Sequence, residues 1–139
     1  MKTISLAVLG LLATTGFAFA ADPSGTWRLD NGKITVKVRQ CGGEICANIV
    51  GLKEPTYKDG KAKIDKYNKN PALRNRPLMG LAVLSNMKPS GDGTWAGNIY
   101  NADDGRTYNA TMTMSGNTMK LKGCVAGIFC KTNTFKKVN

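Results

Sequence analysis

Residues 95–123, WAGNIYNADDGRTYNATMTMSGNTMKLKG, contain two turn signals that divide the stretch into three strands. The pairs Asp104-Gly105 and Gly116-Asn117 tolerate the positive φ that tight hairpin turns require. A hairpin turn fixes the register of its two strands, and the register decides which side chains share a face. The stretch therefore predicts three antiparallel strands whose pairing can be written out residue by residue.

Both turns predict the same buried face. A two-residue loop at Gly116-Asn117 gives the facing pairs Ser115–Thr118, Met114–Met119, Met112–Leu121 and Ala110–Gly123. A four-residue loop at 102–105 gives the facing pairs Ile99–Tyr108, Gly97–Ala110 and Trp95–Met112. The apolar residues fall on one face, with threonines and lysines on the other, and a slip of one residue would invert this.

The register also predicts a row of small residues, Gly97, Ala110 and Gly123, across the three strands. Such a row either forms a dip in the inner wall that holds a ligand or lets another element approach closely. Sequence alone leaves both interpretations open.

Residues 1–20 have the pattern of an export signal. Lys2 is followed by the apolar run 4–12 and by the small-residue cleavage pattern Ala18-Phe19-Ala20. The run is shorter than the ~20 residues that span a bilayer, and no later segment approaches that length. Cleavage after Ala20 would leave residues 21–139 as one domain of a periplasmic or secreted protein.

The chain is strongly basic, with 20 Lys and Arg against nine Asp and Glu. An exported protein of this charge can meet anionic lipid headgroups, acidic polymers or an anionic ligand. Alternatively, the charges form a solvated outer face, since they fall opposite the predicted apolar faces at Lys33, Lys37, Arg39, Lys120 and Lys122. The chain has no arginine-rich arm and no recognisable binding motif, so nucleic acid is not an expected partner.

Four cysteines in an exported chain indicate two disulfides, with three possible connectivities. The spacing favours the local pairs Cys41–Cys46 and Cys124–Cys130. Pairing Cys41 with Cys46 across a four-residue loop puts Val38 opposite Ile49 and Val36 opposite Gly51, with both sulfurs on the outer face. Neither spacing is C-x-x-C, so a redox role for the cysteines is not expected. A structural zinc site is not expected either, because the compartment is oxidising.

The remaining chain predicts further strands with one apolar face each. They are residues 24–29, 33–40, 45–52, 81–84 and 132–138, separated by a turn at Asn31-Gly32, a long polar loop at 53–79 and a turn-rich segment at 85–93. Eight consecutive strands predict an all-β fold, an eight-stranded up-and-down antiparallel barrel. In the last strand Phe135 faces inward, but Lys131 and Asn133 share its parity. Either a polar spot lies inside the barrel or the register there is wrong.

No catalytic constellation is present. The chain has no histidine, the commonest general base and catalytic metal ligand. Asp103 and Asp104 have the composition of an ordinary turn. Asp65 with Arg74 and Arg76 could handle an anion or a substrate on the long loop. We expect no enzyme, no cofactor and no metal; an enzyme using Asp65 or the arginines is the third hypothesis.

Several motifs along the mature chain resemble a known family. They are Gly25-Thr26-Trp27, Cys41-Gly42-Gly43-Glu44-Ile45-Cys46, residues 74–81 (RNRPLMGL), residues 95–100 (WAGNIY), residues 104–108 (DGRTY), Lys122-Gly123-Cys124 and Cys130-Lys131-Thr132. The chain is similar to small exported bacterial proteins grouped as domain of unknown function 2147. The resemblance implies a lipocalin-like, calycin-type barrel over residues 21–139 and no settled activity.

Three positions depart from that family's pattern. Asn101-Ala102 stands where Asp-Pro is frequent, so the turn should be looser; Phe135 stands where tryptophan is common; and Ala47 follows the second cysteine in place of glycine. None of these departures conflicts with the barrel.

The leading functional hypothesis is a non-enzymatic protein that binds a small, at least partly apolar or amphipathic ligand inside the barrel. The predicted lining residues are Trp95, Ile99, Tyr108, Met112, Met114 and Met119, with Arg74 and Arg76 near the mouth. The methionines offer an adaptable apolar wall, or they simply fill the core. The alternative hypothesis is a filled barrel that acts through its basic outer surface on an anionic envelope component or another protein.

Overall fold

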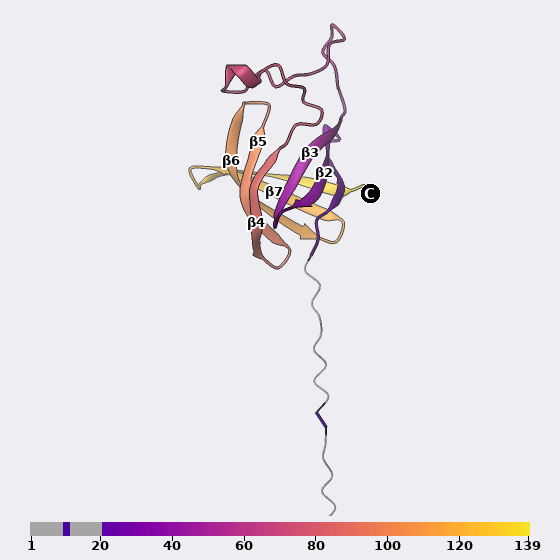
Figure 1. Ribbon diagram of the computed structural model, residues 1–139, viewed down its shortest axis with the longest axis vertical. Coiled ribbons are helices and arrows are strands. Elements are labelled where there is room, and N and C mark those ends of the chain that lie inside the picture. The colour runs from indigo at the N-terminus through magenta and orange to yellow at the C-terminus, as the bar shows by residue number, and fades with distance from the viewer. Residues whose placement is uncertain (1–9, 12–20) are drawn as a thin grey trace, which may run out of the picture.

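Eight antiparallel strands follow one another around a closed barrel, and the last strand pairs with the first (Figure 1). The computed structural model describes residues 10–11 and 21–139, so the predicted export signal lies outside the described residues except at positions 10 and 11. The strands are β1 (Gly25–Leu29), β2 (Ile34–Cys41), β3 (Glu44–Leu52), β4 (Leu84–Gly91), β5 (Thr94–Asn101), β6 (Arg106–Ser115), β7 (Thr118–Val125) and β8 (Phe129–Lys137). The predicted up-and-down barrel is confirmed.

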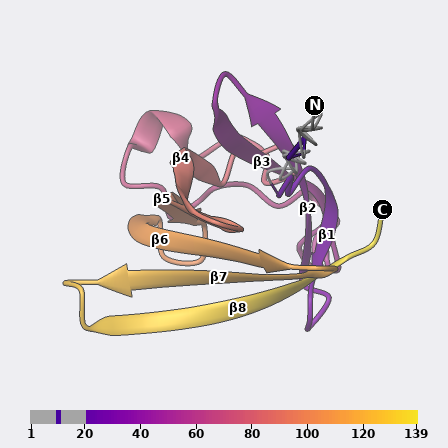
Figure 2. The ribbon, with the colours of Figure 1, turned by 90° about the horizontal axis from the view of Figure 1, so that it is seen from below.

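The pairing of β5, β6 and β7 follows the register predicted from the two turns. Trp95 faces Met112, Gly97 faces Ala110, and Met114 faces Met119. Met112 and Met119 are fully buried, so the predicted apolar face is the inner face of the barrel. Strands β7 and β8 continue as a long hairpin that extends past the neighbouring strands (Figure 2).

The predicted register of β2 and β3 is wrong by two residues. The connection is a two-residue turn at Gly42-Gly43, in which both glycines have positive φ (66° and 81°). Val38 therefore faces Ala47, and Val36 faces Ile49. The prediction placed the two cysteines directly opposite each other and overlooked the turn chemistry of Gly-Gly. A shift of two residues preserves the side-chain alternation, so the predicted inner and outer faces stand.

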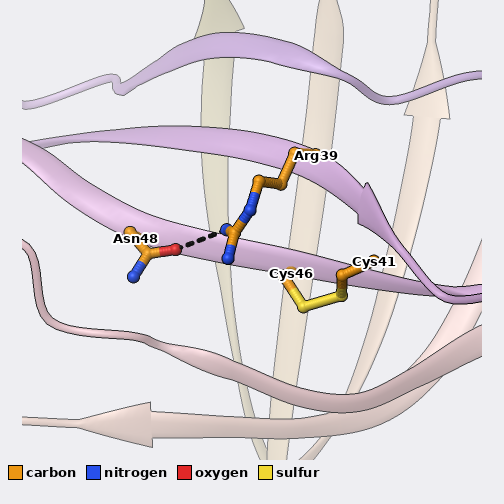
Figure 3. Close-up of a disulfide and its surroundings, with 4 residues drawn as sticks. All are labelled: Arg39, Cys41, Cys46 and Asn48. Carbon is orange, nitrogen blue, oxygen red and sulfur yellow. Dashed lines mark hydrogen bonds between the residues drawn. A yellow bond between two sulfur atoms is a disulfide. The ribbon is translucent and has the colours of Figure 1, made fainter.

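Both predicted disulfides are present. Cys41 and Cys46 are joined diagonally across the β2–β3 hairpin, with Cα atoms 6.0 Å apart (Figure 3). On the same strands, Arg39 Nη1 donates a 2.7 Å hydrogen bond to Asn48 Oδ1. Cys124 and Cys130 are directly facing residues of β7 and β8 and close the tip of that hairpin.

The predictions of a strand at 81–84 and of a turn-rich segment at 85–93 are both wrong, because β4 begins only at Leu84 and includes most of 85–93. Only Asp92 and Gly93 form the turn between β4 and β5. The register shifts between Ser85 and Lys88 and again after Pro89, which disrupts the alternation that marks a strand in sequence. Strand β8 also begins three residues earlier than predicted, at Phe129.

Residues 53–83 form the long connection between β3 and β4, at the top of Figure 1. Within it, a 3-10 turn at Pro71–Leu73 is capped by the Asn70 side chain. Isolated bridges pair Thr56 with Ala62 and Ile64 with Pro77, so the connection has a defined course.

The core fills the end of the barrel away from this connection. Trp27, Met87 and Met112 are fully buried there, and Trp27 Nε1 donates a 2.8 Å hydrogen bond to the Pro23 carbonyl. The other end of the barrel is left for a cavity.

Candidate functional site

A cavity of about 1020 Å³ occupies the barrel between the filled end and the long connection. Its wall is made of apolar side chains from the inner faces of the strands: Ile34, Val36, Val38, Ala47, Ile49, Leu84, Ile99, Met119, Leu121 and Phe135. Pockets for small molecules are typically 300–1,000 Å³ and mostly apolar, with a few polar groups that orient the ligand. The barrel therefore has room for one small molecule.

The row of small residues serves two purposes. At Gly97 a Cβ atom would lie 2.5 Å from the Asn86 carbonyl oxygen, so this glycine allows the irregular backbone of β4 to approach. At Gly123 a Cβ atom would make only ordinary contacts, 3.6 Å from Ile99 and Tyr108 side-chain atoms, and Gly123 lines the cavity. Ala110, between them, is buried in the core. Gly97, at one end of the row, allows the close approach of β4, and Gly123, at the other end, leaves a dip in the cavity wall.

The six predicted lining residues separate into two groups. Ile99, Tyr108 and Met119 line the cavity. The other three do not: Trp95 and Met112 are buried in the core, and Met114 is half-buried against it. On their own strands all three lie beyond the cavity-lining residues Ile99 and Tyr108, although β7 lines the cavity at the facing positions Leu121 and Met119.

The predicted arginines lie on the long connection and outside the cavity lining. Arg74 Nε donates a 2.8 Å hydrogen bond to the Asn68 carbonyl, which orders the turn around Pro71–Leu73. Arg76 Nε donates to Asp65 Oδ2 at 2.9 Å. Arg76 also lines a separate groove outside the barrel, beside the cavity mouth.

The mouth of the cavity is polar. Lys33 forms a 2.7 Å ion pair with Asp103 across it, and Lys63 lies 3.6 Å from Glu54. The Tyr108 hydroxyl donates to Asp104, and this bond raises the pKa of Tyr108 above its usual value. The ionic groups around the opening are thus partly paired with one another.

Lys131 and Asn133 extend this polar character along β8. Both line the cavity, on the same face of the strand as buried Phe135, so the polar spot left open by the sequence pattern exists. Lys131 faces Gly123, which has no side chain to cover it. Among the described residues no ion pair involves Lys131. Its ammonium group is available to a ligand.

A buried carboxylate anchors the long connection to the barrel. Asp65 is fully buried and accepts hydrogen bonds from Tyr100 of β5 (2.6 Å), Asn68 (2.8 Å) and Arg76 (2.9 Å). Burial raises the pKa of Asp65, but the three hydrogen bonds and the Arg76 charge outweigh burial and hold this pKa below its usual range. Burial, and then the bond to Asp65, raise the pKa of Tyr100.

Sequence reasoning grouped Asp65 with the arginines but missed Tyr100, its shortest partner. Nothing in the pattern links residues 35 positions apart, because the loop's path is set by tertiary packing. In the described part of the chain no cluster of three or more His, Cys, Asp or Glu could hold a metal ion. No helix among the described residues is long and apolar enough to cross a membrane.

Comparison with solved structures supports the lipocalin-like fold. The chain is similar to protein HP1028 from Helicobacter pylori, described as belonging to the lipocalin family, with 26% identity and a TM-score of 0.74. The similarity covers 86% of this chain and 85% of that one. A lipocalin-like fold suggests binding of a small ligand.

A second structure, the octameric penicillin-binding protein homologue from Pyrococcus abyssi, is 14% identical with a TM-score of 0.43. The match covers 82% of this chain and 18% of that one. No curated protein matches the chain. The model of the family described as "Uncharacterized protein conserved in bacteria (DUF2147)" matches residues 25–137, which is most of the chain, and the protein belongs to this family.

Proposed function

We propose that the protein is an exported, non-enzymatic binding protein that carries one small amphipathic molecule in its barrel. The observation that supports this most strongly is the cavity itself, about 1020 Å³, with an apolar wall and a polar mouth. The apolar part of the ligand would contact Ile99, Met119 and the neighbouring wall. Its polar end would lie among Tyr108, Lys131 and Asn133.

Lys131 favours a ligand whose polar end is anionic. Its charge lies on the inward face of β8, next to the surface left open by Gly123. A carboxylate or phosphate there would gain a charge-assisted hydrogen bond, while its chain replaces water against the apolar wall. Export, through residues 1–20 and into the periplasm or beyond, is part of the same proposal.

The first experiment is native mass spectrometry of the protein purified from its own host. We expect an additional mass that leaves on mild denaturation and is chemically unchanged on release. Unchanged release also tests the non-enzymatic part of the proposal. A copurified molecule that is recovered as a reaction product would contradict it.

The second experiment blocks the cavity. Gly123→Phe places a ring into the cavity from a backbone that accepts a Cβ atom, and Thr111→Phe adds the same ring on the exposed outer face of β6. We expect a fluorescent fatty-acid probe to bind the wild type and Thr111→Phe equally and to bind Gly123→Phe at least about tenfold more weakly. Equal binding by all three proteins would place the ligand elsewhere and overturn the proposal.

A further inference from the structure

The tip of the β7–β8 hairpin exposes large apolar side chains that lie outside the hydrophobic core. Ile128 is 75% exposed, Phe129 72% and Val125 44%. The hairpin projects past the neighbouring strands (Figure 2), and these exposed side chains lie at its tip. A cluster of exposed large apolar side chains at a projecting point is a feature of interaction sites.

The tip is held in one conformation before any partner arrives. The Cys124–Cys130 disulfide closes its base, and pairing continues to Val125 and Phe129. A preformed site loses less conformational entropy on binding than a flexible one. The tip is therefore built to present its apolar side chains.

A basic groove lies directly beside the tip. It has a volume of about 720 Å³, and its lining includes Lys69, Arg76 and Arg106 together with Val125 and Ala126 of the hairpin. None of the groove's described lining residues is acidic. Asp65 accepts a hydrogen bond from the Nε of Arg76, and no described hydrogen bond uses the two terminal nitrogens of this guanidinium group. The groove can therefore accept anionic oxygens.

We propose that the hairpin tip and this basic groove together dock the protein on an anionic lipid bilayer. Ile128 and Phe129 would enter the boundary between headgroups and acyl chains, while Lys69, Arg76 and Arg106 would contact headgroup phosphates. In a bilayer the anionic phosphates and the apolar acyl chains lie at adjacent depths. The cationic groove and the apolar tip lie side by side and match these two layers. The long connection, residues 53–83, adds to the attraction because it carries eight Lys and Arg against three Asp and Glu.

Docking in this orientation would bring the cavity to the lipid surface. Ile128, Phe129 and Lys131 line the cavity mouth as well as the hairpin tip. A bound amphipathic molecule could then pass between cavity and bilayer without crossing bulk water. This last step rests on the proposed function; the docking itself does not.

The test is flotation of the full mature protein with lipid vesicles. We expect binding to vesicles containing phosphatidylglycerol, weaker binding at high ionic strength, and little binding to phosphatidylcholine alone. The double variant Ile128→Ser/Phe129→Ser should bind at least about tenfold more weakly. Its matched control, Val50→Ser/Val138→Ser, removes two exposed apolar side chains elsewhere and should bind like the wild type.

The charge contribution has its own pair of variants. Lys69→Gln/Arg106→Gln removes two groove cations and should weaken binding, whereas Lys37→Gln/Lys120→Gln removes two exposed cations from the outer strand faces and should weaken it less. Arg76 is left intact because it holds Asp65. Equal losses in the two variants would reduce the effect to net charge and overturn the groove's role.

Three outcomes would overturn the docking proposal. They are no binding of the wild type to anionic vesicles, equal binding of the tip variant and its control, and a tip-dependent complex formed with an acidic protein but not with lipid. Gly123→Phe separates this proposal from the ligand proposal, since it should lose the probe and keep the vesicles. If the wild type binds the probe but not the vesicles, the docking proposal alone is wrong. If the wild type binds the vesicles but not the probe, the ligand proposal alone is wrong.

Discussion

At the scale of single residues, the Asp65 carboxylate makes stability depend on pH. Its folded pKa lies below the usual value, so its contribution is fully present above the unfolded pKa of about 4 and is lost as pH falls through the folded pKa. Tyr100 provides the shortest of the three hydrogen bonds. The tyrosine is therefore the residue through which this dependence can be changed with least disturbance.

Tyr100→Phe should lower the free energy of unfolding at pH 7 by about 1.5 kcal/mol, the order expected for one hydrogen bond to a buried carboxylate. The pKa of Asp65 should rise toward its usual value, so the variant should lose less stability than the wild type on acidification. Urea unfolding between about pH 2 and pH 7 measures both effects. Tyr67→Phe, at an exposed tyrosine, is the control, and parallel curves for Tyr100→Phe and the wild type would contradict the assignment.

At the scale of elements, the long connection docks against the β5–β6 turn through a glycine. Gly105 has a φ of 69°, and a Cβ atom there would lie 1.8 Å from the Tyr67 carbonyl oxygen. Gly60 has a similar φ of 83° but open space around it. The two positions therefore share backbone strain and differ only in the contact.

Gly105→Ala should release residues 53–83 from the barrel, while Gly60→Ala should carry only the strain of the left-handed backbone, about 1 kcal/mol. Limited proteolysis with trypsin measures the release of the connection directly, because the connection contains eight Lys and Arg. We expect cleavage within the connection to be much faster in Gly105→Ala than in Gly60→Ala. Equal cleavage rates would mean that the connection does not depend on this contact.

The elements that could be predicted from sequence are those with an unambiguous turn. Asp104-Gly105 and Gly116-Asn117 fixed three strands in the correct register. The fourth strand was predicted at 81–84 instead of at 84–91, because the bulges of β4, with Asn86 at a φ of 53°, break the period-two pattern. The β2–β3 register failed where two local signals competed, the glycine pair and the cysteine pair, and the glycines determined the turn.

The candidate site was less predictable than the fold. Alternation indicates which side chains point inward, but not how far along the barrel the packing stops. Met112 and Met119 have the same inward parity, yet one is in the filled end and the other lines the cavity. The depth of packing depends on where the bulky Trp27 and Trp95 lie, which follows from the closed barrel as a whole.

At the scale of the whole molecule, an unfilled cavity makes stability respond to its occupant. A ligand present at 100 times its Kd should add about 2.7 kcal/mol to the free energy of unfolding of the wild type. Gly123→Phe should show no such increase, and Thr111→Phe should show all of it. Thermal unfolding with and without the fatty-acid probe measures the difference, and an equal shift in all three proteins would contradict binding in the cavity.

The pairing of β8 with β1 has a consequence for how the protein is made. Every other pairing joins strands that are neighbours in sequence, so each can form as soon as its second strand is available. The β1–β8 pairing joins the first strand of the barrel to be synthesised with the last. Its facing pairs are Trp27 with Lys137, Arg28 with Lys136 and Leu29 with Phe135. A chain whose β8 is not yet available can hold the seven preceding strands in order, but its barrel stays open until β8 pairs with β1.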